Sequence, residues 1–220
     1  MLIAGVDDAG RGPVIGPLVI AGVLLDERDT YRLKELGVKD SKLLSPLRRE
    51  QLAEDIKKLV EKFHVERLSP VEIDRVVDTG IKLHKLNRLE AHTMAKVIDA
   101  LKPDVAYVDA SDVLADRYRA HILDKLSFQV KIISEHKADL NYPVVSAASI
   151  IAKVERDREI QKLVERFGDM GSGYMTDPKT VGFLEKWFAR CGSYPEFVRK
   201  SWKPAREMHS NAKSKQMKLR

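Results

Sequence analysis

Short apolar runs alternate with longer amphipathic stretches along most of this chain. The first run lies at the N-terminus and indicates a buried strand that ends on two adjacent acids. The longer stretches repeat apolar residues at helical spacing, and most begin or end at a capping residue, a proline or a glycine. The pattern predicts strands over residues 2–6, 14–25, 64–68, 104–109 and 128–134, and helices over residues 29–36, 46–63, 70–79, 83–101, 115–126, 144–167 and 178–190.

Strands that alternate with helices indicate an α/β protein with a mixed sheet flanked by helices. The chain shows neither an internal repeat nor a long linker. Its character changes after residue 168, where a Gly-Ser-Gly-Tyr loop is followed by one predicted helix and a basic tail. We therefore expect an α/β domain over residues 1–168 and a small helical C-terminal region over residues 169–220.

The composition favours a globular protein that binds a polyanion. Its 220 residues are 44% hydrophobic and carry a net charge of +6. No apolar run approaches the ~20 residues that span a bilayer, and the N-terminus lacks the features of a signal peptide. The single cysteine, Cys191, cannot form an internal disulfide. We therefore expect a cytoplasmic monomer with no membrane partner, and its positive charge favours nucleic acid.

Four acidic residues are candidates for a metal site. Asp7 and Asp8 follow the first apolar run, and Asp109 ends a second run in the same way. Asp139 lies between a predicted strand and a long predicted helix. Ligands of open α/β sheets bind at strand ends, so we expect these side chains to converge on one edge. Crowded carboxylates suit hard Mg²⁺ or Mn²⁺, and two such ions ~3.5–4 Å apart clamp the attacking and leaving oxygens of a phosphodiester. Asp109 or Asp139 taken alone is more typical of a turn or a helix cap.

A glycine-rich loop follows the first pair of acids. Gly10 and Gly12 let a backbone approach a ligand closely, and Arg11 offers a guanidinium to phosphate or sugar. A dinucleotide-binding loop is rejected, because the glycines are spaced G-x-G-x-x-x-G and prolines stand where that loop would open a helix. A polar turn is the simpler alternative. Tyr174 lies in the second glycine-rich loop, where it has little core to fill, whereas Lys42 on its own is typical of a solvated surface charge.

Taken together, these segments resemble ribonuclease HII, most closely its archaeal form. The motifs run in order from residue 5 to about residue 180, which makes the match specific. They are GVDDAGRGPVIGP from Gly5, VKDSK from Val38, YVD from Tyr107, EHKAD from Glu135, VVSAASIIAKVERDR from Val144, GSGY from Gly171 and DPKT from Asp177.

The resemblance implies an RNase H-like fold and a hydrolase that acts on nucleic acid. The implied enzyme is an endoribonuclease that cleaves the RNA strand of RNA–DNA hybrids and nicks 5′ to a single ribonucleotide embedded in duplex DNA. It implies a two-metal mechanism with Mg²⁺ or Mn²⁺, which leaves 5′-phosphate and 3′-hydroxyl ends. A non-catalytic, basic RNA-binding protein is the alternative function.

The same resemblance implies roles for individual residues. Metal-ligand roles fall on Asp7, Asp109, Asp139 and position 8. Recognition of the ribose 2′-hydroxyl and the adjacent phosphate falls on the first glycine-rich loop, since that hydroxyl distinguishes RNA from DNA. The substrate contacts implied are those of Gly10, Arg11 and Gly12 with the ribose and phosphate, of Tyr174 with the next sugar, and of Lys42 with a phosphate.

Two positions depart from the family pattern. Position 8 is Glu in the family and Asp here, and both a natural variant and an introduced substitution are compatible with it. We expect the shorter side chain to weaken the enzyme. The segment Gln216-Met217-Lys218-Leu219-Arg220 has the Gln and an aliphatic residue of a sliding-clamp motif without its aromatic residue, which argues against clamp binding.

Overall fold

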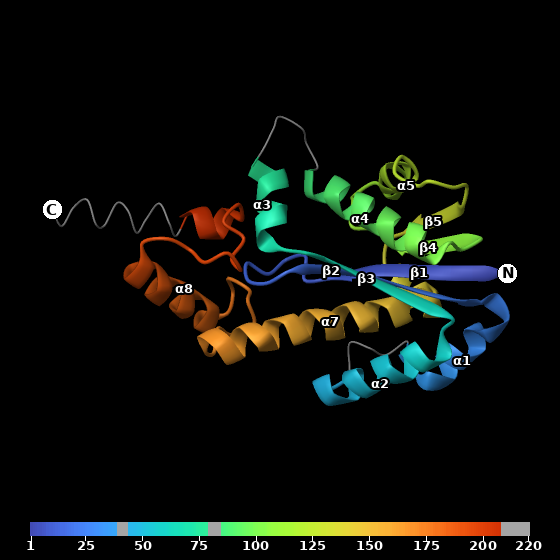
Figure 1. The fold of residues 1–220 in the computed structure, drawn as a ribbon, viewed down its shortest axis with the longest axis horizontal. Coiled ribbons are helices and arrows are strands. Elements are labelled where there is room, and N and C mark those ends of the chain that lie inside the picture. The colour runs from blue at the N-terminus through green and yellow to red at the C-terminus, as the bar shows by residue number, and fades with distance from the viewer. Residues whose placement is uncertain (39–43, 79–84, 208–220) are drawn as a thin grey trace. The chain divides into compact units, whose positions relative to one another are not determined.

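The computed structural model describes residues 1–38, 44–78 and 85–207. The strands alternate with helices over most of this range, as the sequence predicts (Figure 1). In chain order the elements are β1 (Leu2–Ala9), β2 (Leu18–Asp26), η1 (Glu27–Asp29), α1 (Thr30–Leu36), α2 (Pro46–Leu59), β3 (Lys62–Leu68), α3 (Pro70–Asp78), α4 (Lys85–Leu101), β4 (Val105–Asp109), α5 (Ala115–Leu123), β5 (Lys131–Glu135), α6 (Ala138–Asn141), α7 (Pro143–Phe167) and α8 (Pro178–Cys191).

The five strands form one sheet in the order β3-β2-β1-β4-β5. Strand β2 runs antiparallel to β1, whereas β4 and β5 run parallel to their neighbours. This arrangement confirms the predicted mixed sheet flanked by helices. In the described residues, no helix is both long and apolar enough to cross a membrane.

The residues fall into two compact units that alternate along the chain. The first, here called the sheet unit, comprises Met1–Ala9, Val19–Arg67 and Leu83–Asp157. The second, here called the C-terminal unit, comprises Gly10–Leu18, Leu68–Lys82 and Arg158–Arg220. Because each unit is assembled from separate stretches, the division does not test the predicted boundary at residue 168, which stays a prediction.

Both faces of the sheet in the sheet unit are covered by helices (Figure 1). One face packs against α1, α2 and α7, and the other packs against α4 and α5. Successive side chains of a strand point to opposite faces, so β1 contributes to both cores. Its contribution to the α7 side includes Ile3 and Ala9, and its contribution to the α4 side includes Ala4 and Val6.

Gly5 allows α7 to cross β1 at very close range. A Cβ atom placed on Gly5 would lie 2.3 Å from the carbonyl carbon and oxygen of Val144 and 2.5 Å from the amide nitrogen of Val145. These are backbone atoms, which cannot rotate out of the way. The absence of a side chain at Gly5 therefore fixes the separation between β1 and the first turn of α7.

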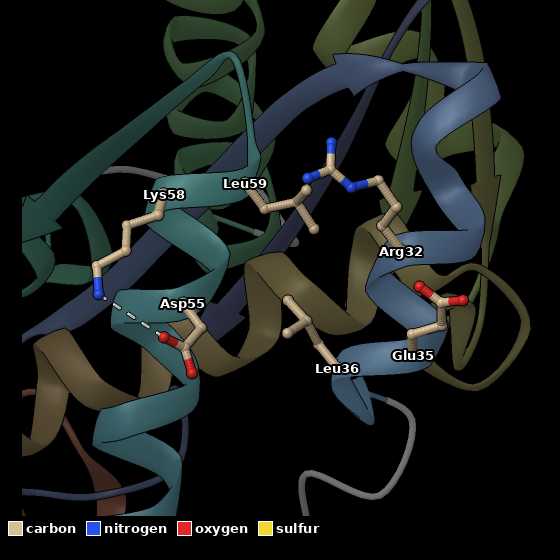
Figure 2. A pocket seen from close by; sticks show the side chains of 6 residues that line it. All are labelled: Arg32, Glu35, Leu36, Asp55, Lys58 and Leu59. Atoms are coloured by element: carbon tan, nitrogen blue, oxygen red, sulfur yellow. Dashed lines mark ion pairs between the residues drawn. The ribbon is translucent and has the colours of Figure 1, made fainter.

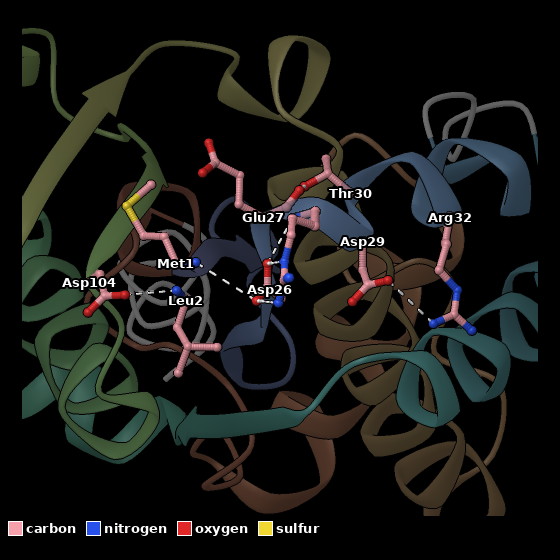
Figure 3. Close-up of polar contacts among 9 residues, drawn as sticks. Met1, Leu2, Asp26, Glu27, Asp29, Thr30, Arg32 and Asp104 are labelled. Carbon is pink, nitrogen blue, oxygen red and sulfur yellow. Dashed lines mark hydrogen bonds and ion pairs between the residues drawn. The ribbon is translucent and has the colours of Figure 1, made fainter.

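The N-terminal end of β1 is anchored by hydrogen bonds and ion pairs (Figure 3). The amide of Leu2 donates to Asp104 Oδ2 at 2.8 Å, and the α-amino group of Met1 lies 3.8 Å from Asp26 Oδ2. The Thr30 hydroxyl donates to the carbonyl of Glu27 at 2.7 Å where α1 begins. These contacts hold the end of the strand that lies away from Asp7 and Asp8.

The turn from β4 to α5 is built around a buried carboxylate. Asp112 is 1% exposed, accepts a hydrogen bond from the amide of Leu114 at 3.0 Å, and accepts another from Arg117 Nε at 3.0 Å. A second guanidinium nitrogen of Arg117 also pairs with this carboxylate. Its hydrogen bonds with Arg117 hold the pKa of Asp112 well below its usual range. Because Ser111 directly precedes it, Asp112 also fixes the start of the turn.

The C-terminal unit has its own core, which is rich in aromatic side chains. Leu184 and Phe188 of α8 pack with Val14 and Ile15 from the segment before β2. The amide of Val14 donates to the carbonyl of Gly173 at 2.7 Å, and Ile15 forms an isolated β-bridge with Val198. Residues 14–17 therefore do not form the start of a strand as predicted. Gly16, with φ at 89°, breaks the extended run before β2 begins at Leu18.

Local end signals predicted most element boundaries well. The Ser45 hydroxyl accepts from the amide of Arg48 at the start of α2, and Ser69 and Glu72 form a capping box at the start of α3. Other predicted boundaries were wrong in detail. Helix α2 ends at Leu59 because Val60 is extended, α5 ends at Leu123, and β5 begins only at Lys131. The short helix α6 was not predicted.

We expect Gly5→Ala to lower the free energy of unfolding by about 3 kcal/mol or more, because the added methyl group meets backbone atoms of α7. The matched control is Gly182→Ala in α8, where a Cβ atom meets nothing within 4 Å. The control should stabilise the protein by about 0.4–1 kcal/mol. Urea denaturation of both variants measures the difference, and equal stabilities would contradict the close packing at Gly5.

We expect Asp112→Asn to lower the free energy of unfolding at pH 7 by about 1–3 kcal/mol, because a charged hydrogen-bond partner of Arg117 is removed. The pKa of Asp112 is lowered in the folded state, so its stabilising effect is complete above about pH 4, the ordinary value for an unfolded chain. The effect is then lost progressively as the pH falls. Melting temperatures of the protein and the variant should therefore converge below about pH 4.

Candidate active site

Asp7 is a buried carboxylate within the last part of β1. The side chain is on the α7 side of the sheet, and the residue is only 6% exposed. Its Oδ1 accepts a hydrogen bond from the amide of Asp8 at 2.7 Å, and the Ser149 side chain of α7 also hydrogen-bonds to it. The sequence predicted that the strand ends before the two acids. The strand in fact continues to Ala9, so Asp7 and Asp8 lie inside β1.

Asp109 is the last residue of β4 and belongs to the neighbouring parallel strand. The register pairs Val6 with Val108, which places Asp7 and Asp109 one step further along adjacent strands. The backbone amide of Ala138 donates to Asp109 Oδ1 at 3.1 Å. The predicted meeting of acids from two strand ends is therefore present in the sheet unit.

Burial and mutual repulsion raise the pKa values of these carboxyl groups. Burial raises the pKa of Asp7 well above its ordinary range, and the carboxylates of Asp8 and Asp109 raise it further. The pKa of Asp109 is raised by burial and then by the carboxylates of Asp139 and Asp8, against a hydrogen bond from Ala138 that lowers it. The four acids predicted from the sequence thus form one group of interacting charges.

Asp8 and Asp139 occupy the two borders of this acidic cluster, which we define as Asp7, Asp8, Asp109 and Asp139. Asp8 is half-buried, and its Oδ2 accepts a hydrogen bond from the Ser111 hydroxyl at 2.8 Å. Asp139 is 8% exposed and lies in the short helix α6. Lys137, with φ at 57°, takes the left-handed conformation that turns the chain from β5 into this helix.

The donor set of the acidic cluster fits a hard divalent cation, since all four side chains are carboxylates and repel one another. The present side-chain directions are nevertheless not those of a formed site. Within residues 1–38, 44–78 and 85–207, no three acidic, histidine or cysteine groups surround one point closely enough to hold a metal ion. Asp7 and Asp8 emerge on opposite faces of β1, and Asp8 and Asp109 are turned towards Ser111 and Ala138. Cation binding therefore requires side-chain rotation.

Four of the predicted substrate contacts, namely Gly10, Arg11, Gly12 and Tyr174, lie in the C-terminal unit. Gly10, Arg11 and Gly12 form a loop in which Gly10 has φ at 87°. The structure brings this loop together with Tyr174, because a Cβ atom on Gly12 would lie 3.1 Å from Tyr174 Cε1. The tyrosine is 43% exposed, so one side of its ring remains accessible. Lys42 lies outside the described residues.

Comparison with known proteins places these observations in one family. The sequence model of the family described as ribonuclease HII matches residues 4–205. The chain belongs to the ribonuclease HII family. It is therefore a hydrolase of the RNase H class.

Three relatives illustrate the extent of the similarity. Ribonuclease HII of Pyrococcus abyssi is 45% identical over 221 residues, which cover 100% of this chain and 96% of the relative. The crystal structure of ribonuclease H2 from Pyrococcus horikoshii OT3 matches with a TM-score of 0.89 and 44% identity, covering 96% of this chain and 98% of the other. The structure of the PCNA:RNase HII complex from Archaeoglobus fulgidus matches with a TM-score of 0.83 and 46% identity, covering 92% of this chain and 96% of the other.

Two residues beside the acidic cluster were not predicted from the sequence. Ser149 of α7 hydrogen-bonds to Asp7, and Ser111 donates to Asp8. The position of Ser111 two residues after Asp109 is the one sequence signal that could have indicated its role.

The hollow between α1 and α2 is not a second candidate site (Figure 2). Its apolar lining comes from Leu36 and Leu59, and an ion pair of 3.8 Å joins Lys58 to Asp55 at its border. None of the predicted catalytic or substrate-binding residues lines this hollow. Its side chains offer neither a nucleophile nor a group of metal ligands, so the acidic cluster remains the candidate active site.

We expect Asp7→Asn to raise the melting temperature in EDTA by about 2–4 °C, because one repelling charge is removed and the amide keeps the Oδ1 acceptor. The variant should also lose the stabilisation that Mn²⁺ gives to the unchanged protein, since an amide is a poor ligand for a hard cation. Asp104→Asn, at the other end of the sheet, is the control and should give no rise (Figure 3). If Asp7→Asn melted at a lower temperature than the unchanged protein in EDTA, repulsion between Asp7 and its neighbouring carboxylates would be refuted.

Proposed function

We propose that this member of the ribonuclease HII family cleaves the RNA strand of RNA–DNA hybrids and nicks duplex DNA 5′ to a single embedded ribonucleotide. The products are a 3′-hydroxyl and a 5′-phosphate. The observation that carries this proposal is the group of mutually repelling carboxylates at the ends of β1 and β4. Such a group is costly in a protein without a cationic partner, which supports a role in divalent-metal chemistry.

The acidic cluster would hold two divalent cations through Asp7, Asp8, Asp109 and Asp139. When bound, such ions supply Lewis-acid stabilisation to the attacking and leaving oxygens of a phosphodiester. The protein supplies the four carboxylates and their positions on the backbone. Without a cation, Ser149 and the amide of Asp8 stabilise Asp7. Asp8 and Asp109 would give up their hydrogen bonds with Ser111 and the amide of Ala138 when they rotate towards a cation. The all-oxygen donor set favours Mg²⁺ or Mn²⁺ over zinc.

Recognition of the ribose is assigned to the loop of Gly10, Arg11 and Gly12. The glycines allow the backbone to approach a sugar closely, and the 2′-hydroxyl is the group by which a protein distinguishes RNA from DNA. The half-exposed ring of Tyr174 beside Gly12 offers a stacking surface for the neighbouring sugar. Lys42 is assigned a phosphate contact on the motif alone. The net charge of +6 supports binding to a polyanion, with an affinity that falls steeply with salt.

The partner in this proposal is nucleic acid only. The Archaeoglobus fulgidus relative was solved with PCNA, but residues 208–220 of the present chain lie outside the described residues. Contact with a sliding clamp is therefore not part of the proposed function.

A cleavage assay on three matched duplexes tests the proposal. The duplexes contain one ribonucleotide, an all-RNA strand, or DNA only, and each is incubated with Mg²⁺, Mn²⁺ or EDTA. The expected result is a metal-dependent cut 5′ to the ribonucleotide, with ends that a DNA ligase can rejoin and no cut in the DNA duplex. If the protein retained the RNA-containing duplexes uncut with either metal, the RNA-binding alternative would replace the proposal.

We expect Asp8→Glu to raise kcat by about 10- to 100-fold, because Asp is shorter by one methylene than the Glu of the family and a misplaced metal ligand costs about that much in rate. Mg²⁺ requires near-ideal octahedral distances, so Mn²⁺ should support the unchanged protein better than Mg²⁺. KM should change little. Asp116→Glu is the control and should alter neither constant, because Asp116 is an exposed residue of α5 that pairs with Arg119. An unchanged kcat for Asp8→Glu would remove position 8 from the metal site.

A further inference from the structure

Arg199 is the largest completely buried side chain of the C-terminal unit that carries a charge. The residue is 0% exposed, although arginine is almost never fully buried unless its donors are satisfied. Its side chain reaches the loop that follows β1, which is 183–189 residues away in the sequence. Burying a charged side chain costs free energy, so a completely buried arginine indicates a specific role.

The guanidinium of Arg199 donates hydrogen bonds to three backbone carbonyls of one loop. It donates to the carbonyl oxygens of Gly10 at 2.5 Å, of Arg11 at 2.8 Å and of Gly16 at 3.0 and 3.2 Å. The amide of Arg199 also donates to the carbonyl of Val14 at 2.8 Å. The planar fork of the guanidinium is suited to several acceptors in fixed directions at once. One residue thus determines the path of the loop from Gly10 to Gly16.

Trp202 donates to a fifth backbone carbonyl of the same loop. Its indole Nε1 donates to the carbonyl of Gly12 at 3.2 Å, and the guanidinium of Arg199 lies 4.9 Å from its ring centroid. The segment itself is anchored through Asp74, which accepts from the amide of Ser201 at 3.0 Å and from its hydroxyl at 2.5 Å. The segment from Arg199 to Trp202 is therefore a firm support for the loop.

The direction of these carbonyls determines the direction of the loop's amides. In a trans peptide the C=O and the following N–H point in opposite directions, and the described residues contain no cis bond. Because the carbonyls of Gly10 and Arg11 point to the guanidinium, the amides of Arg11 and Gly12 point away from it. Two successive amides that point the same way form a small concave donor site for an oxygen-rich ligand.

We propose that Arg199 is a positioning residue for ribose recognition, which holds the loop so that the amides of Arg11 and Gly12 face the sugar and phosphate of the substrate. This inference rests on the proposed function, because it assumes that the loop reads the ribose. Arg199 itself does not touch the substrate. A lysine in its place carries the same charge but cannot span the carbonyls of Gly10, Arg11 and Gly16 with one ammonium group.

The test measures ribose discrimination by the full chain in Ca²⁺, as the ratio of Kd values for an all-DNA duplex and for the same duplex with one ribonucleotide. Arg199→Lys should lower this ratio by about 10- to 100-fold, the cost of a displaced binding group. A purely structural role would lower the melting temperature and leave the ratio unchanged, which would overturn the inference. Arg206→Lys is the matched control, because Arg206 lies on the following helical turn and pairs with Asp78 instead of the loop.

Two further measurements keep the inference separate from its assumptions. If the unchanged protein binds both duplexes equally, the proposed function fails, and the inference fails with it. If the unchanged protein discriminates and Arg199→Lys does so equally well, only the inference fails. Should Arg199→Lys show no cooperative unfolding, Trp202→Phe replaces it, since this variant removes the hydrogen bond to Gly12 and keeps an aromatic ring beside Arg199. It should lower the ratio by a smaller factor, and an unchanged ratio would again overturn the inference.

Discussion

The repulsion between carboxylates at the ends of β1 and β4 is the constraint around which the sheet unit is organised. Two of these acids, Asp7 and Asp139, are almost completely buried, where an ionised group loses most of its hydration. The repulsion cannot be relieved by moving the strands, since their register is fixed by the backbone ladder. The protein instead stabilises Asp7, Asp8 and Asp109 through nearby donors, which are Ser149, Ser111 and the amide of Ala138 respectively.

Several contacts that look unrelated in the sequence serve this constraint. Because Gly5 has no side chain, α7 lies close to β1. This close packing allows Ser149 to form a hydrogen bond with Asp7. The buried Asp112 fixes the turn that presents Ser111 to Asp8. A stable α/β framework thus tolerates a local arrangement that is unfavourable by itself, as is common where a site is prepared for a ligand.

The sequence predicted those parts of the fold that depend on local signals. The helix start at Ser45 and the capping box at Ser69 follow from side chains within one turn, and the mixed sheet follows from the alternation of elements. The expected gathering of acids followed from two strand ends with the same pattern. The sequence could not predict where the second strand starts, because Ile15 pairs with Val198 through a contact that no local pattern encodes. The roles of the site residues remain predictions.

Chemistry and selection depend on different kinds of contact in this chain. The acidic cluster is assembled from residues no further along than Asp139, on two strands that pair directly with one another and on the short helix α6. The loop from Gly10 to Gly16 immediately follows β1, yet its carbonyls are satisfied by Arg199, near the end of the described chain. Contacts between residues so distant in the sequence require closure of a long loop, which costs conformational entropy. Local structure does not form them by itself. Under the proposed function, the acidic cluster depends on contacts within the sheet unit, whereas the loop assigned to ribose recognition depends on contacts with Arg199 within the C-terminal unit.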